Sequence, residues 1–170
     1  DTIRKLDPSY KTAQVDGMYY FALRNYGHSL ILQAGNLEGG IYQLTLAERF
    51  GPLDNTAYGL REGARMYLVG ASFWELDWQQ AYTYFSQVGA GWPSMWDGTM
   101  TASNRLYIAA MRYGDDLYKR QQFCDAYNMY QIASGMGELD NPAAGYADDS
   151  FVQCFPATPT FEPTPTLGLT

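Results

Sequence analysis

Few residues of this chain are capable of chemistry, and they are widely spaced. Among its 170 residues His28 is the only histidine, and a lone helical histidine serves packing far more often than catalysis. The pairs Asp115-Asp116 and Asp148-Asp149 carry the oxygen ligands that hard metal ions take, but neighbouring residues of a helix point about 100° apart. We expect both pairs on solvated helix faces. Because nucleophile elbows, zinc motifs and phosphate loops are also missing from the sequence, we predict no enzyme, cofactor or metal site.

Cys124 and Cys154 are the only cysteines, and their separation is unlike that of a metal or redox motif. A disulfide that ties the last helical hairpin to the final helix fits better. Such a bond implies an oxidising compartment, so we expect an extracellular or cell-surface protein. The alternative is a pair of buried free thiols, since cysteine is often buried without bonding.

Composition narrows the classes of partner. The net charge of −7 and the pI near 4.5 argue against binding to a phosphate backbone, so nucleic acid is excluded. No apolar run reaches the roughly 18 residues that a membrane-spanning helix needs, so we expect no transmembrane span. The chain begins at Asp1 without a methionine, which suggests a processed chain or a piece of a longer one.

The stretch from residue 60 to residue 93 positions the largest concentration of aromatic side chains. Two apolar stripes with helical spacing meet across Glu75, Leu76 and Asp77, and Asp77 is a natural N-cap for the second helix. So short a connection predicts an antiparallel helical hairpin that ends before Pro93. We expect its close contacts at Gly70, Phe73, Ala81 and Phe85.

This pattern resembles a tetratricopeptide repeat, and it recurs. Gly114, Ala126 and Tyr130 repeat the order of small and aromatic residues, and a weaker copy surrounds Gly40. The resemblance extends over roughly residues 18 to 142 and implies an α-solenoid. The anchors Gly40, Ala81 and Ala126 lie 41 and 45 residues apart, longer than the typical repeat of about 34 residues. The family's signature tryptophan is missing, with Arg24, Met66 and Ala110 near its place.

We therefore predict an all-α, TPR-like solenoid of three antiparallel hairpins over residues 16–154, closed by a C-terminal capping helix. Residues 1–15 are expected to form an extended arm. The expected helices start after Asp16, at Gly40, after a cap at Asn55 or Thr56, at Trp78, at Thr101 and at Phe123; the last runs from Pro142 to Cys154 behind an Asn141 cap.

Residues 155–170 form a Thr/Pro-rich tail. Its prolines exclude helix and favour extended polyproline II conformation, and its threonines suit O-linked glycans. A linker to a further part of a longer protein is the alternative. Among the threonines and prolines the tail carries four apolar anchors, which a linker would not need: Phe155, Phe161, Leu167 and Leu169.

Two functions follow from these patterns. In the first, a secreted structural subunit assembles with copies of itself into an extracellular filament or tube, through stacking of helical domains and docking of the tail on a neighbour. In the second, a TPR-like scaffold or adaptor exported from a bacterial cell binds peptides, as the resemblance implies. Candidate side chains for gripping a peptide are Arg24, Asn25, Arg61, Arg65, Asn104, Arg105 and Arg112, although each is equally suited to pairing with a neighbouring acid.

Overall fold

The computed structural model describes residues 5–7, 9 and 11–156, and this part of the chain is all-α, as predicted. It contains no strand; a single bridge joins Trp96 to Thr101 in the loop before α6. Seven long helices follow one another: α2 (Thr12–Leu32), α3 (Leu37–Ala47), α4 (Asn55–Ser72), α5 (Trp78–Gly91), α6 (Ala102–Lys119), α7 (Phe123–Ser134) and α8 (Asn141–Cys154).

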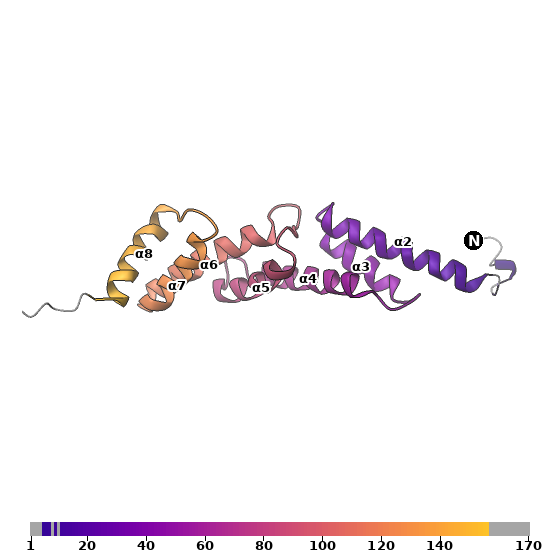
Figure 1. Cartoon of the computed structure of the whole chain (residues 1–170), viewed down its shortest axis with the longest axis horizontal. Coiled ribbons are helices and arrows are strands. Elements are labelled where there is room, and N and C mark those ends of the chain that lie inside the picture. Colours follow the sequence, from indigo (N-terminus) through magenta and orange to yellow (C-terminus); the bar gives the residue numbers. More distant parts are fainter. Residues whose placement is uncertain (1–4, 8, 10, 157–170) are drawn as a thin grey trace, which may run out of the picture.

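Each of these helices packs against the next one along the chain, and together they form an elongated molecule (Figure 1). The helices α2 and α3, α4 and α5, and α6 and α7 are the three consecutive pairs that the sequence predicted. The last helix, α8, packs on α7 and also contacts α6. As a result α2 lies at one end of the molecule and α8 at the other (Figure 1).

The N-terminal end departs from the expected extended arm. The helix α2 begins at Thr12 rather than after Asp16, so residues 12–15 belong to the helical part. No proline separates Thr12 from Asp16, and Ala13 and Gln14 are good helix formers, so the helix continues toward its N-terminus past the predicted cap.

Three further helix starts were placed too late by the sequence. Asparagine caps α3, where the side chain of Asn36 accepts a hydrogen bond from the Gly39 backbone N–H. Aspartate caps both α4 and α8, through Asp54 and Asp140, in place of the expected Asn55 or Thr56 and Asn141. A carboxylate accepts more strongly than an amide or hydroxyl, and it also complements the positive end of the helix dipole. The predicted cap Asp77 is confirmed, and Thr101, the predicted start of its helix, is the N-cap of α6.

Within each helix pair a glycine of the first helix lies directly under a large side chain of the second. A Cβ atom added to Gly114 would lie 2.8 Å from the Tyr130 ring, and one added to Gly70 would lie 3.2 Å from the Phe85 ring. The first pair repeats this contact between Gly27 and Leu44, where the added atom would lie 2.8 Å from the Leu44 side chain. The absence of a side chain therefore sets how closely the paired helices approach.

The second helices share one buried spacing, in which a small residue is followed by a large one four positions later and a further apolar one three positions after that. The three sets are Gly40, Leu44 and Ala47 in α3, Ala81, Phe85 and Val88 in α5, and Ala126, Tyr130 and Ala133 in α7. Of the seven predicted packing anchors, Gly70, Ala81, Phe85, Gly114, Ala126 and Tyr130 are buried. Phe73 is half-buried and stacks on Tyr84 at 5.9 Å between ring centroids.

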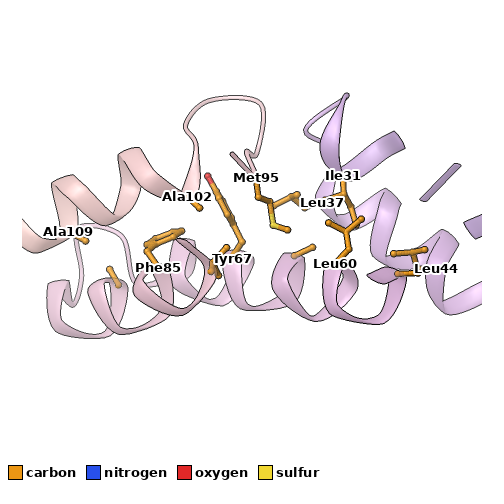
Figure 2. Close-up of a cluster of buried hydrophobic side chains, with 13 residues drawn as sticks. Ile31, Leu37, Leu44, Leu60, Tyr67, Phe85, Met95, Ala102 and Ala109 are labelled. Atoms are coloured by element: carbon orange, nitrogen blue, oxygen red, sulfur yellow. The ribbon is translucent and has the colours of Figure 1, made fainter. Parts of the chain in front are cut away.

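The buried side chains form two clusters along the molecule. The larger one extends from Ile31 in α2 to Ala109 in α6, with Tyr67, Phe85 and Met95 at its centre (Figure 2). Tyr67 meets Phe85 edge to face at 5.1 Å between centroids. The smaller cluster joins α6, α7 and α8 and contains Tyr130. The core thus extends along the molecule from the C-terminal half of α2 to α8.

Candidate interaction surfaces

The outer side of α2 carries an apolar stripe that contacts no buried part of the chain. The stripe consists of Val15, Met18, Tyr19 and Ala22, which line a shallow groove of about 320 Å³. At about 100° per residue this i, i+3, i+4, i+7 spacing forms one helix face, roughly opposite the face that buries Gly27 and Ile31. We call these four residues the α2 stripe.

Nothing in the first half of α2 is buried. The buried residues of α2 are Gly27 and Ile31, both in its second half. In the first half Met18 is 72% and Phe21 63% exposed. A helix that is apolar on two sides is ordinarily covered on both. Here one side meets α3. On the other side Tyr19 stacks on Phe50 at 5.4 Å between ring centroids, and the groove at the stripe is lined by α2 residues alone among the described residues.

A second stripe lies at the opposite end of the molecule, on the last turns of α8. Asp148, Phe151, Val152 and the C-cap Phe155 have the same i, i+3, i+4, i+7 spacing, although Asp148 is charged and Phe155 follows the last helical residue; we call these four residues the α8 stripe. Phe151 is 48%, Val152 60% and Phe155 56% exposed. Beside them Tyr127 of α7 contacts both phenylalanine rings, with centroids 5.4 and 5.8 Å away. Tyr127, Gln131, Ala147 and three stripe residues line a groove of about 410 Å³.

Sequence reasoning did not identify either stripe as a surface. The predicted arm excluded Val15 from the first helix, and the prediction placed Phe155 in the tail instead of with the last helix. The i, i+3, i+4, i+7 spacing of both stripes is nevertheless readable in the sequence. It signals a second apolar face on a helix that already has one.

The arginines that were candidates for gripping a peptide are engaged with acids inside the protein. Arg24 binds Asp54, and Arg112 bridges Asp115 and Asp140. The remaining ion pairs are those of Arg61 with Glu48 and Glu62, of Arg65 with Glu62, and of Arg105 with Asp97. Of the two amides in the same set, Asn25 accepts a hydrogen bond from Arg24, and the backbone N–H of Asn104 donates to the Thr101 cap. These arginines hold the helices together.

Two of these pairs link one helix pair to the next through a helix cap. Arg24 of α2 binds the carboxylate that caps α4, and Arg112 of α6 binds the carboxylate that caps α8. Each capping aspartate therefore neutralises an arginine while it accepts a backbone N–H. Because these hydrogen bonds favour the ionised form, the Arg24 and Ala57 contacts lower the pKa of Asp54 to about 2.

Arg105 is 8% exposed, and among the described residues Arg61, at 5%, is the one cation that is buried more deeply. Its Nε donates to the Tyr67 hydroxyl at 2.9 Å, and its guanidinium lies 4.7 Å from the Trp74 ring centroid. Asp97, in the loop before α6, accepts from the same guanidinium at 2.5 Å. The guanidinium also lies 5.7 Å from the Phe85 ring centroid, so this site joins α4, α5 and α6 around one charge. Of the two roles that the sequence left open for Arg105, the structure shows the pairing with a neighbouring acid.

The acidic pairs are only partly on solvated faces. Asp148 is exposed, but Asp115 is 7% exposed, and its carboxylate accepts hydrogen bonds from the Tyr130 hydroxyl and from Arg112. The expectation for Asp115 was therefore wrong, because the small residue Gly114 beside it brings α7 close enough for the tyrosine to reach the carboxylate. Within the described part of the chain no group of three histidine, cysteine or acidic residues is arranged to hold a metal ion.

Cys124 and Cys154 lie where the predicted disulfide requires them. Their sulfur atoms are 2.03 Å apart, bonding distance, and their Cα atoms are 4.9 Å apart. One cysteine is in the first turn of α7 and the other is the last residue of α8. The bond therefore ties the end of α8, and the α8 stripe with it, to its neighbour.

Of the four predicted tail anchors only Phe155 can be placed. It is exposed and packs against Phe151 at 5.3 Å between centroids, as part of the α8 stripe. Phe161, Leu167 and Leu169 lie outside the described residues.

Acid should destabilise the fold through Asp97. Burial by itself would raise the pKa of Asp97, but hydrogen bonds from Thr99, Met100 and Arg105 outweigh it and lower the pKa to about 2. The ordinary value is 3.8, so the carboxylate stabilises the fold fully above about pH 4, and the contribution is lost as pH falls toward 2. We expect a loss of about 2 kcal/mol from this group.

Urea unfolding at pH 7, 4 and 2.5 measures the effect. In Asp97→Asn the free energy of unfolding should fall less between pH 7 and pH 2.5 than in the unmodified protein. Asp148→Asn, which changes an exposed carboxylate, should leave the pH dependence unchanged. Equal acid dependence in the Asp97→Asn variant and the unmodified protein would contradict the assignment.

None of the described helices has the length and apolar character of a membrane span. Comparisons with protein-family models, with curated proteins and with solved structures found no match.

Proposed function

We propose that this protein is a secreted structural subunit that assembles head to tail into an extracellular filament or tube. In this proposal the three helix pairs form a short TPR-like solenoid with α8 at its C-terminal end. The proposal also assigns the protein a mechanical rather than a catalytic role.

The proposal rests on an apolar surface at each end of an elongated molecule that is largely exposed among the described residues. The two surfaces are different, one on α2 and one on α7 and α8, so a contact between them joins unlike ends. Such a contact leaves one free end of each kind, and it propagates into a filament unless the rotation between copies closes a ring. Large exposed apolar patches are ordinarily interaction sites.

The ion pairs favour this function over peptide binding. A peptide-binding solenoid needs cations that are free to meet a carboxylate, and the five candidate arginines are each paired with an acid of the same chain. Recruiting one of them would break a contact between helices. We therefore keep the scaffold or adaptor role as the weaker alternative.

The tail has a second part in the proposed assembly. Its first residue, Phe155, belongs to the α8 stripe, at an end that would meet the next copy. We propose that residues 155–170 continue along that copy, where Phe161, Leu167 and Leu169 add apolar contacts. A polyproline II segment loses little conformational entropy on docking because it is already stiff.

The disulfide supports the proposed location. Cys124 is exposed to solvent, so a reducing compartment would give reductants access to the bond. An oxidising, extracellular environment preserves it.

Light scattering and electron microscopy of the purified protein test the proposal. We expect particles much larger than 19.1 kDa that grow with concentration, and elongated or tubular objects in micrographs. Deletion of residues 155–170 should prevent long assemblies while circular dichroism shows the helices intact. A monomer at every concentration would contradict the proposed function.

A further inference from the structure

We infer that α8 is one half of an incomplete helical hairpin, and that the N-terminal half of α2 from the next copy supplies the missing helix. This inference rests on the proposed head-to-tail assembly and names the surfaces that meet in it.

The packing of α4 and α6, which are the first helices of their pairs, shows what α8 lacks. Along the chain α4 packs between α3 and α5, and α6 packs between α5 and α7. By contrast α8 has α7 on one side, and no described helix follows on the other. The α8 stripe touches α7 on one flank, through Tyr127, and its two phenylalanines and one valine remain 48–60% exposed. An added helix on the other side would bury them as α7 buries the side chains of α6.

The first half of α2 has the properties of such a helix. It is already helical in the free chain, so docking requires no folding of a new segment. The α2 stripe has the same spacing as the α8 stripe, and stripes of this kind pack side by side as helix pairs. The residues of α2 before Gly27 and the whole of α8 are both about 21 Å long at 1.5 Å per residue, so the two surfaces match in length.

Charge favours this pairing over a contact between like ends. The last fifty residues contain six acids and no lysine, arginine or histidine, and Asp148 lies in the α8 stripe itself. Two such ends repel each other. Residues 1–16 carry Arg4, Lys5 and Lys11 against three acids, so the N-terminal end is neutral and is the less acidic partner. Repulsion between two acidic ends disfavours that contact and leaves the head-to-tail contact favoured.

Two single substitutions in the full-length chain test the pairing. Met18→Glu puts a charge on the α2 stripe and leaves α8 able to accept a helix; Val152→Glu does the reverse. Both side chains are exposed, so neither change should unfold the protein, which circular dichroism verifies. Leu76→Glu, at an exposed position in the turn between α4 and α5, is the matched control.

Each variant alone should be monomeric by light scattering at a concentration where the unmodified protein and Leu76→Glu assemble. Mixed in equal amounts, the two variants should form a dimer and nothing larger, because one intact α2 stripe meets one intact α8 stripe.

Several results would overturn the inference while leaving the proposed function standing. One is that either variant alone assembles as well as the unmodified protein does. Another is that Val152→Glu alone forms a dimer, which would show that two α2 stripes meet each other. If the mixture stays monomeric although each variant is folded, the stripes do not pair. If the unmodified protein is itself a monomer, the inference fails together with the proposed function.

Discussion

Replacing Arg105 with methionine should lower the free energy of unfolding by about 3 kcal/mol, more than a surface charge would. The change leaves the carboxylate of Asp97 without its cation in a site where the aspartate side chain is 18% exposed. It also removes the donor to the Tyr67 hydroxyl, whose pKa burial raises to about 12, so that the phenol stays neutral and loses a charged partner. Breaking a largely buried pair on one side costs more than the pair contributes, because the remaining charge stays desolvated.

Urea unfolding of three variants separates the parts of this effect. Arg105→Lys keeps the charge but loses the planar stacking on Trp74, so its stability should lie between those of Arg105→Met and the unmodified protein. Adding Asp97→Asn to Arg105→Met should recover part of the loss, because no unpaired charge remains. If Arg105→Met were as stable as the unmodified protein, the contacts of Arg105 with α4 and α5 would not contribute to the free energy of unfolding.

Removing the disulfide should have an effect of similar size. Cross-linking Cys124 to Cys154 closes a loop over 30 residues of sequence, which the chain-entropy model values at about 3–4 kcal/mol. The double variant Cys124→Ser with Cys154→Ala should unfold at correspondingly lower urea concentration. Since α8 packs mainly on α7, it should be the first helix to lose protection from hydrogen exchange.

Reduction provides the control for that variant. The unmodified protein in the presence of a phosphine reductant should match the double variant in stability, because both lack the same bond. Free thiols detected in freshly isolated protein under non-reducing conditions, or equal stability of the variant and the oxidised protein, would contradict a stabilising disulfide. Loss of α8 order should also weaken assembly if the α8 stripe is an interface.

The sequence alone determined the elements that depend on short-range patterns. Apolar spacing and turn signals placed the ends of α5, α6 and α7, and the recurring Ala81 and Ala126 anchors occupy equivalent buried positions. The same reading paired the two cysteines, because consecutive helices joined by a short turn must be neighbours. Where several capping residues stood together, as before α4, it could not choose among them, since each can accept the same backbone N–H.

Tertiary structure alone decided which charged side chains are buried and which apolar helix faces are covered. Arg105 and Asp115 look like surface residues in a sequence, and only contacts from Tyr67 and Tyr130 on neighbouring helices bury and satisfy them. Likewise, helical periodicity can show that α2 and α8 are apolar on more than one side. Which side a neighbour covers depends on how the helices stack, and among the described residues the stacking leaves Met18 of α2 and Val152 of α8 mostly exposed. Burial is a property of long-range neighbours, which local spacing does not encode.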